Sequence, residues 1–202
     1  LDKVDPAKAM AVAGVRKVLT TDNAVAVVAD HYGAAKKGLA ALEIAWNPGP
    51  NAGFSSQVWG QQLARALKGR GVRAFDEGDV RQALADAPQR MDAVYEAPPL
   101  AHAAMEPLNC TLHVRPGACE IWLGTQAPAR AQNMVAQVLG LPATNVVVHN
   151  HLIGGGFGRK LDADYVETAA RFARQVDYPI KLVFSREEDM QHDAYRPYFR
   201  DE

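Results

Sequence analysis

The residues best suited to chemistry form a glycine-rich run in the second half of the chain. Residues 154–160 read Gly-Gly-Gly-Phe-Gly-Arg-Lys and lie between an expected strand and an expected helix. Consecutive glycines allow the backbone to approach a ligand closely and its N–H groups to point outward. Arg159 and Lys160 add positive charge at the same edge. This glycine loop predicts a cradle for an anion or for the oxygen atoms of a ligand, with a flexible strand-to-helix connection as the plainer alternative.

The spacing of the glycine loop does not fit the two common phosphate-binding motifs. A P-loop requires Gly-x-x-x-x-Gly-Lys-Ser/Thr, but Arg159 follows Gly158 and Leu161 follows Lys160. A dinucleotide fingerprint requires Gly-x-Gly-x-x-Gly, and its third glycine would fall on Arg159 or Leu161. A nucleotide-binding, kinase-like domain therefore conflicts with these residues.

Histidines and cysteines offer two weaker candidates. His149 and His151 share one face of an expected strand, but no third metal ligand stands at a short spacing, so ordinary strand histidines are favoured over a metal pair. Cys110 and Cys119 fall on opposite arms of an expected hairpin, where Cys110 would face Leu123. We therefore expect two free buried thiols and no disulfide.

The elements expected in the first half of the chain are short and mixed. They are a helix over 5–10 capped by Asp5, strands over 15–20 and 23–29, a helix over 32–42 and a strand over 43–46. The breaker cluster at 47–53 predicts a linker. Helices then follow from Ser55 to about Gly69 and over 80–86.

The second half predicts both hairpin and crossover connections. We expect strands over 93–96, 109–114, 119–123, 145–153 and 180–184, with a type II turn at Pro116-Gly117. Helices are expected from Pro128 to Gly140, from a cap at Asp162, and from a capping box at Ser185. This mixture predicts an α+β fold, divided into a small α/β portion at 1–47, a linking helical segment at 48–92, and a mixed α/β domain at 93–202.

Composition excludes several classes of protein. Of 202 residues, 48% are apolar and 22% charged, which is enough apolar material to form a core. A net charge of −1 gives no long-range attraction to nucleic acid or to an anionic membrane. No apolar run approaches the roughly 18 residues that span a bilayer, and no secretory leader is visible. The chain starts at Leu1 without an initiator Met, and we expect it to be a piece of something longer.

Four segments together resemble one family. They are 102–110 (His-Ala-Ala-Met-Glu-Pro-Leu-Asn-Cys), 125–128 (Thr-Gln-Ala-Pro), 154–158, and 185–190 (Ser-Arg-Glu-Glu-Asp-Met). They occur in the order seen in the molybdenum-binding subunits of the xanthine dehydrogenase and aldehyde oxidase family. Asn109-Cys110, Arg159 and the segment 191–197 look most similar to isoquinoline 1-oxidoreductase β subunits and related aldehyde dehydrogenases. The resemblance covers nearly the whole chain and makes 1–47 a portion similar to the hammerhead-like domain, and 93–202 part of a molybdenum-cofactor-binding domain.

The resemblance implies a specific chemistry. Enzymes of this family hydroxylate an aldehyde carbon or an electron-poor ring carbon with oxygen taken from water. Their molybdenum is held by a pterin dithiolene and not by protein side chains, and a cytosine dinucleotide form of the cofactor is expected here. Electrons leave through [2Fe-2S] clusters on a small partner subunit. The protein positions and polarises the cofactor, which carries the difficult steps.

The same resemblance assigns roles to residues of this sequence. Gln126 is expected to place its amide beside an oxygen ligand of the metal, and Phe157 to offer a backbone N–H to those ligands and its ring to the pocket wall. Gly154, Gly155, Gly156 and Gly158 would allow close approach of the cofactor, with Arg159 beside them. The plainer alternatives are a helix-capping amide for Gln126 and an ordinary core aromatic for Phe157.

Two departures from the family pattern limit these expectations. Arg159 stands where many xanthine dehydrogenases have another glycine, and nothing here matches the family's catalytic glutamate, which lies near the end of a much longer subunit. Glu106 is expected to be a structural carboxylate in a turn next to the site. We expect the chain to need the remainder of the large subunit for activity. The alternative is a non-catalytic docking module of the same fold, and the substrate, electron acceptor and compartment stay open.

Overall fold

The structure, a computed structural model, describes residues 1–201 and divides into two compact units. The first unit consists of Leu1–Pro48 and His102–Ala194, and the second of Gly49–Ala101 with the residues that follow Ala194. Within the described residues, no helix is both long enough and apolar enough to cross a membrane.

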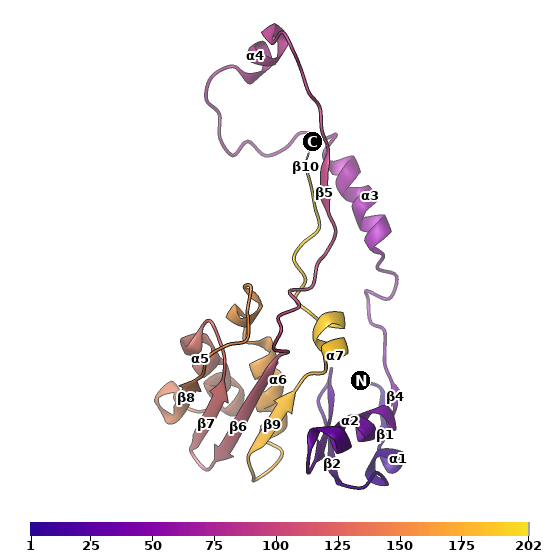
Figure 1. The fold of residues 1–202 in the computed structure, drawn as a ribbon, viewed down its shortest axis with the longest axis vertical. Coiled ribbons are helices and arrows are strands. Elements are labelled where there is room, and N and C mark those ends of the chain that lie inside the picture. Colours follow the sequence, from indigo (N-terminus) through magenta and orange to yellow (C-terminus); the bar gives the residue numbers. More distant parts are fainter. Residues whose placement is uncertain (202) are drawn as a thin grey trace. The chain divides into compact units, whose positions relative to one another are not determined.

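A four-stranded sheet organises the larger part of the first unit (Figure 1). Its strand order is β8 (Val146–Asn150), β7 (Ala118–Leu123), β6 (Asn109–Arg115) and β9 (Ile180–Val183). Strands β6 and β7 form an antiparallel hairpin, β9 is antiparallel to β6, and β8 runs parallel to β7. Hairpin and crossover links thus occur in one sheet, which confirms the α+β class.

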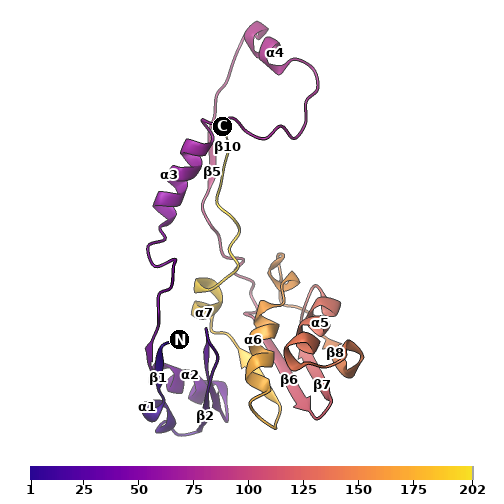
Figure 2. The same cartoon turned by 180° about the vertical axis from the view of Figure 1, so that it is seen from behind.

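Two helices cover one face of this sheet and bury the main core (Figure 2). They are α5 (Pro128–Leu139) and α6 (Asp164–Ala173). Alternate residues of β6 and β7 point toward them and are fully buried, because successive side chains of a strand face opposite sides. The core includes Cys110, Leu112, Cys119, Ile121, Val135, Val146, Val166 and Ala169. Burial of each large apolar side chain contributes about 1.5–3 kcal/mol to stability.

The turns of this region follow the expected chemistry. Pro116 and Gly117 connect β6 to β7, and Gly117 has a φ of +74°, the conformation that the third position of a type II turn requires. Helix α5 ends at Gly140, which is left-handed with a φ of +67°. Ser185 caps α7 (Arg186–Gln191) by accepting the N–H of Glu188. These three predictions are confirmed.

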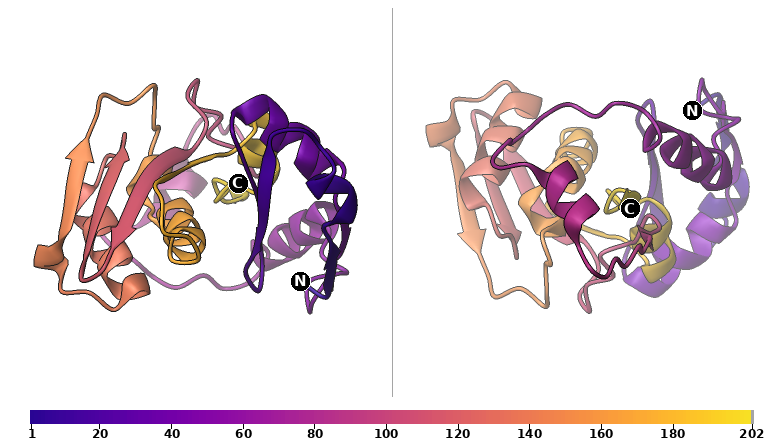
Figure 3. Two further views of the ribbon diagram at one scale, coloured as in Figure 1. Left: turned by 90° about the horizontal axis from the view of Figure 1, so that it is seen from below. Right: turned by 90° about the horizontal axis from the view of Figure 1, so that it is seen from above.

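The N-terminal part of the first unit consists of two antiparallel strand pairs with two helices (Figure 3). Strand β1 (Lys3–Asp5) pairs with β4 (Glu43–Ala45), and β2 (Val15–Thr20) pairs with β3 (Val25–Ala29). Helices α1 (Ala7–Met10) and α2 (Tyr32–Ala40) accompany them. A Cβ at Gly38 would lie 2.8 Å from Val15, so α2 approaches the β2–β3 hairpin through a glycine. Strand β1 was not expected from the sequence.

The second unit is less densely packed. It contains α3 (Ser56–Ala66), α4 (Val80–Asp86), and the antiparallel pair β5 (Tyr95–Ala97) and β10 (Phe199–Asp201). Ser55 and Asp79 cap the two helices by accepting backbone N–H groups. No described residue of α3 or α4 is buried.

Three expectations about boundaries are wrong. The strand expected over 145–153 begins only at Val146, after a short 3-10 helix, η1 (Ala143–Asn145), and it ends at Asn150, before the segment that leads into the glycine loop. Asp162 does not cap α6, because a second 3-10 helix, η2 (Arg159–Leu161), ends at this point. The carboxylate of Asp162 instead accepts a hydrogen bond from Arg130. The N-cap of α1 is Pro6 in place of Asp5, although Asp5 still accepts the N–H of Ala7.

Both cysteines are free and buried, as expected, and their chemistry follows from that burial. Burial raises the pKa of Cys110 to about 12 and that of Cys119 to about 11. Because the thiolate is the reactive form, we expect iodoacetamide at pH 8 to alkylate both at least roughly a hundredfold more slowly in the native protein than in guanidinium. Peptide mass spectrometry assigns the labelled sites. Equal rates at Cys110 in the two conditions would contradict the packing described.

Candidate functional site

The glycine loop and Gln126 meet because β7 and β8 are parallel. The carboxyl ends of parallel neighbours lie at the same edge of a sheet, where ligand sites of α/β sheets commonly form. Gln126 follows β7, and the loop follows β8. The two chain segments are joined directly after the strands, where His151 N–H donates to Leu123 O at 2.8 Å and Thr125 N–H donates to Asn150 Oδ1 at 3.1 Å.

The carboxamide of Gln126 lies against the middle of the glycine loop. Gly158 N–H donates to Gln126 Oε1 at 3.1 Å, and a Cβ at Gly156 would lie only 2.4 Å from the same oxygen. Only a residue without a side chain fits at Gly156 in this arrangement. The structure therefore brings together the residues that the sequence singled out on separate segments.

This contact fixes which end of the amide is free to donate. Because Gly158 contributes an N–H, the oxygen of Gln126 must face it, and Nε2 becomes the other end of the group. Within residues 1–201, neither Gln126 Nε2 nor the N–H groups of Gly155 and Gly156 donate a hydrogen bond. Gly156 is a buried residue, and an N–H group without an acceptor is unfavourable at a buried position.

Glu106 connects the beginning of the glycine loop to the segment before β6. Glu106 N–H donates to Gly154 O at 3.0 Å, and Gly154 N–H donates to Glu106 Oε2 at 2.9 Å. Lys160 Nζ lies 2.5 Å from the same carboxylate oxygen, and Asn109 Nδ2 donates to Oε1 at 3.2 Å. The expected structural role of Glu106 in a turn beside the site agrees with these contacts.

The end of the loop is fixed to the residues after β7. The carbonyl of Lys160 accepts from Thr125 Oγ1 at 2.8 Å and from Gln126 N–H at 3.1 Å. Thr125 is 5% exposed and its hydroxyl oxygen also accepts the N–H of Ala127. The backbone position of Gln126 thus depends on the position of the loop.

Arg159 lies in the interior, although the sequence places it beside a ligand. Its guanidinium makes two hydrogen bonds of 2.8 Å to Asp164, and its Nε lies 2.5 Å from Asp193 Oδ1 without the angle of a hydrogen bond. Asp193 also accepts from the backbone N–H of His102 at 2.6 Å and lies 2.9 Å from its ring nitrogen. The side chains of Arg159 and Asp193 are only 4% and 2% exposed.

The electrostatics of these carboxylates follow from their donors. Burial alone would raise the pKa of Glu106, but the hydrogen bonds from Lys160, Gly154 and Asn109 outweigh it and lower that pKa below 4.5. The pKa of Asp193 is lowered below 3.8 in the same way, because His102 and Arg159 outweigh the effect of burial. Both groups are therefore charged at neutral pH and are weak bases.

Backbone strain is concentrated at the same place. Phe157 has a φ of +52° and Ala103 a φ of +47°, and within residues 1–201 no other residue except glycine has a positive φ. Such conformations cost about 1–3 kcal/mol each and cluster at functional sites. The two segments are neighbours, since a Cβ at Gly155 would lie 3.2 Å from the ring of Phe157 and 3.6 Å from Ala104.

Sequence reasoning missed the partners of the loop. Asp193 is separated from His102 by 91 positions, and only the resemblance to the segment 191–197 could have drawn attention to it. Lys160 reads as a surface charge but is 2% exposed. His149, on β8, stacks on Trp122 with ring centroids 4.8 Å apart and bonds to Glu120, as an ordinary strand histidine would. His151 follows the end of β8 and is exposed, so the expectation that both histidines share one strand face is wrong. Within residues 1–201, no three His, Cys, Asp or Glu side chains are grouped as metal ligands would be.

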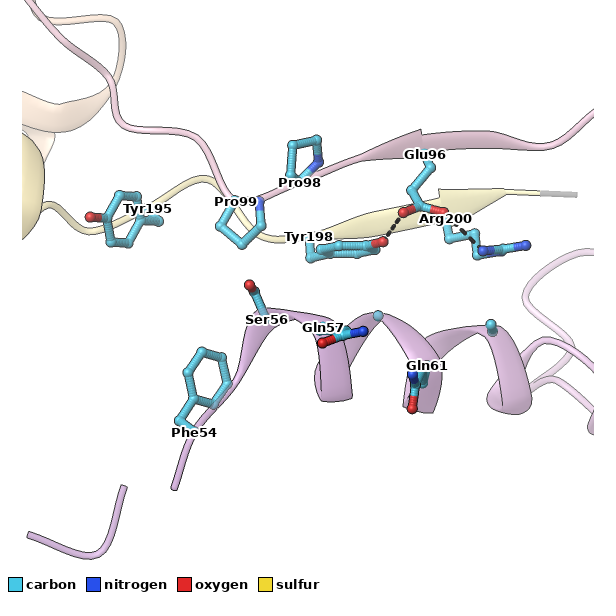
Figure 4. Close-up of a pocket in the computed structure, with 12 residues that line it drawn as sticks. Phe54, Ser56, Gln57, Gln61, Glu96, Pro98, Pro99, Tyr195, Tyr198 and Arg200 are labelled. Carbon is cyan, nitrogen blue, oxygen red and sulfur yellow. Dashed lines mark hydrogen bonds and ion pairs between the residues drawn. The ribbon is translucent and has the colours of Figure 1, made fainter. Parts of the chain in front are cut away.

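A separate groove of about 730 Å³ lies in the second unit, between α3 and the β5–β10 pair (Figure 4). Tyr198 and Arg200 of its wall both bond to Glu96, and Gln57 and Gln61 project from α3. The hydrogen bond to Glu96 raises the pKa of Tyr198. None of the site residues expected from the sequence lines this groove.

Comparison with known protein families identifies the group to which this arrangement belongs. The model of the molybdopterin cofactor-binding domain matches residues 64–200, which is more than half of the chain. This chain belongs to that family. The expected membership in the group of xanthine dehydrogenase and aldehyde oxidase enzymes is confirmed.

Named relatives resemble this chain over nearly its whole length. It is 32% identical over 204 residues to the membrane-bound aldehyde dehydrogenase (pyrroloquinoline-quinone) of Gluconacetobacter polyoxogenes. It is 30% identical over 213 residues to isoquinoline 1-oxidoreductase subunit beta of Brevundimonas diminuta. Each match covers 96% of this chain and 26% of the relative. The chain therefore spans about a quarter of the length of these curated relatives.

Solved structures of low sequence identity share the fold. Quinoline 2-oxidoreductase from Pseudomonas putida 86 superposes with a TM-score of 0.66 at 18% identity, covering 93% of this chain and 29% of that one. Aldehyde oxidoreductase from Desulfovibrio gigas superposes with a TM-score of 0.65 at 16% identity, covering 98% and 26% respectively. These likenesses confirm the expected α+β fold.

Substitution of Gly156 tests the contact between the loop and Gln126. In Gly156→Ala the new Cβ would lie 2.4 Å from Gln126 Oε1, so the amide has to move and release Gly158 N–H. We expect hydrogen exchange at Gly158 to rise about tenfold in the cofactor-free protein, the effect of one lost hydrogen bond. Gly53→Ala is the control, because nothing lies within 4 Å of a Cβ there. Unchanged exchange at Gly158 would show that Gln126 does not hold it.

Acid titration tests the buried network around Asp193. Asp193→Asn removes the charge opposite Arg159 and should lower the free energy of unfolding at pH 7 by about 3 kcal/mol. Because the native pKa of Asp193 is lowered, its stabilisation is present above the ordinary pKa of 3.8 and is lost as the pH falls through the native value. The difference between wild type and variant should shrink from about pH 5 to pH 3.

Denaturant unfolding at several pH values measures this difference. Asp177→Asn, on an exposed aspartate of the same unit, serves as the control and should show no such convergence. A difference between wild type and Asp193→Asn that stays constant down to pH 3 would refute the role of the carboxylate charge.

Proposed function

We propose that this molybdopterin cofactor-binding domain holds the oxygen-ligand side of a molybdenum–pterin cofactor in a longer oxidoreductase. The reaction would be hydroxylation of an aldehyde carbon, or of an electron-poor carbon in an N-heteroaromatic ring, with oxygen from water. Gln126 and Phe157 would face the reacting centre, and Gly154, Gly155, Gly156, Gly158 and Arg159 would contribute to cofactor binding. The names of the relatives, which include an aldehyde dehydrogenase and an isoquinoline oxidoreductase, support this class of substrate.

The convergence of one carboxamide with a bare stretch of backbone carries this proposal. Gln126 Oε1 is engaged by Gly158, which leaves Nε2 as a donor, and the N–H groups of Gly155 and Gly156 have no acceptor within residues 1–201. Three donors beside one another suit oxygen atoms that carry negative charge. The glycine at position 156 allows the carboxamide of Gln126 to lie directly against the backbone of the loop, because a Cβ there would lie 2.4 Å from Gln126 Oε1.

The residues of this chain would bind and orient, while the cofactor, when bound, supplies the oxygen-transfer and redox chemistry. Gln126 would donate from Nε2 to an oxygen ligand, and the rigid loop would donate from its backbone. Phe157, a residue that is 62% exposed, would supply an apolar wall that keeps water away from the substrate. Arg159 would act from the interior, since Asp164 and Asp193 occupy its guanidinium.

The other components of the active enzyme would come from outside this chain. We propose that the remainder of the large subunit supplies the catalytic base and the pterin-binding loops, and that a small subunit with [2Fe-2S] clusters accepts the electrons. The domain division of the sequence, at 1–47, 48–92 and 93–202, belongs to the same proposal. The cofactor would be the cytosine dinucleotide form, which nucleotide analysis after acid hydrolysis can identify.

Gln126→Ala in the mature full-length enzyme tests the proposed function. We expect molybdenum and pterin contents to stay near those of the wild type while kcat falls about a hundredfold, the usual cost of one donor to a developing negative charge. Gln137→Ala, at an exposed position on α5, should change neither quantity. A wild-type protein that holds no molybdenum after proper maturation would refute the proposal and favour a docking module.

A further inference from the structure

One carboxylate joins both ends of the glycine loop. Glu106 Oε2 accepts the N–H of Gly154 at 2.9 Å and lies 2.5 Å from Lys160 Nζ. The same residue returns a backbone hydrogen bond of 3.0 Å to Gly154 O. Six positions of chain separate Gly154 from Lys160, so the contacts with Glu106 close the loop into a ring. Asn109 donates to the second carboxylate oxygen and holds the side chain in this orientation.

Lys160 makes it energetically unfavourable for the loop to separate from Glu106. Its side chain is 2% exposed, and within residues 1–201 its ammonium has no acceptor besides Glu106. A buried ammonium separated from its counter-charge is strongly unfavourable, because little water reaches it. The loop cannot move away from Glu106 without either separating this pair or bringing Lys160 to the surface.

From this geometry we propose that Glu106 is the positioning residue of the site: its carboxylate, paired with Lys160, sets the direction in which the N–H groups of Gly155 and Gly156 point. The inference rests on the proposed function for what those groups bind, but the closure itself is a property of this chain. In this proposal Glu106 acts through its contacts with Gly154 and Lys160 in the loop. The strained φ of Phe157, between the two closed ends, is maintained by the same pair.

The test replaces the ion pair by apolar side chains of similar size, so that no buried charge remains unpaired. The variant Glu106→Leu with Lys160→Met should fold, because such replacements are often neutral for stability. The variant Glu106→Gln with Lys160→Met keeps an acceptor oxygen for Gly154. The control is Glu167→Gln with Arg171→Met, which removes an ion pair on α6 whose glutamate is 33% exposed, against 32% for Glu106.

The first measurement is hydrogen exchange over residues 153–161 in the full-length protein prepared without cofactor. We expect exchange at Gly154–Phe157 to accelerate at least about tenfold in the Leu/Met variant, to be partly restored in the Gln/Met variant, and to be unchanged in the control. Exchange in β6 should be unchanged in all three, which shows that the fold persists. Unchanged exchange in the loop of the Leu/Met variant overturns the proposal. If the Leu/Met variant does not fold, the Gln/Met variant decides. Exchange of the loop at the wild-type rate in a Gln/Met variant whose melting temperature is lowered overturns the proposal.

The second measurement uses the mature enzyme. With the cofactor bound, we expect the Leu/Met variant to shift the molybdenum(V) electron paramagnetic resonance spectrum and to lower kcat about a hundredfold, because small displacements of positioning groups have effects of that size. The control should show neither change. A wild-type spectrum and kcat in the Leu/Met variant would refute positioning. Absence of molybdenum from the wild-type enzyme would refute the proposed function alone, because the exchange measurement needs no metal.

Discussion

The arrangement of the candidate site depends on the neutralisation of one buried ammonium. Lys160, in the η2 turn, is buried, and among residues 1–201 the one carboxylate in contact with its ammonium is that of Glu106. Once Glu106 lies there, its remaining lone pairs determine where Gly154 lies, and the carbonyl of Lys160 determines where Thr125 and Gln126 lie. Both ends of the loop and the segment after β7 are thereby fixed by one charge. Such a pair adds little net stability but specifies one geometry.

The parallel pairing of β7 and β8 brings the fixed loop to the same edge of the sheet as Gln126. An antiparallel partner would have delivered the glycine loop to the opposite edge of the sheet, far from Gln126. Helix α5, which crosses between the two strands, is buried on one side by Ala131, Val135 and Ala136, so the crossover is rigid. The packing of the core thus determines at which edge of the sheet the glycine loop lies, and the ion pairs determine the direction of the loop backbone at that edge. A site of backbone donors requires both, because a backbone group cannot be reoriented by a change of rotamer.

Local patterns predicted the elements and missed the long-range polar contacts. Pro116-Gly117, Gly140 and the Ser185 cap each act within a few residues, so the sequence revealed them correctly. The prediction that Asp162 caps α6 was wrong. An aspartate just before a helix is a common N-cap, but the preceding 3-10 turn moves the start of α6 to Asp164, with Ala163 at the N-cap position. Burial of Lys160 and the pairing of Asp193 with His102 join segments up to 91 positions apart, and no periodicity encodes such contacts. The glycine loop was recognisable from its own residues, whereas Gln126 was found only because several motifs occur in the order seen in a known family.

The strain at Phe157 and Ala103 can be weighed against the interactions that surround it. Two left-handed residues together cost about 2–6 kcal/mol. On either side of them lie two ion pairs, Lys160 with Glu106 and Arg159 with Asp193, and breaking a buried pair costs about 3–5 kcal/mol each. The cost of breaking these pairs therefore exceeds or matches the strain, so the ion pairs oppose relaxation of the loop. Donors held in place in this way need not reorganise when negative charge develops beside them, which is the main advantage that a protein site has over water.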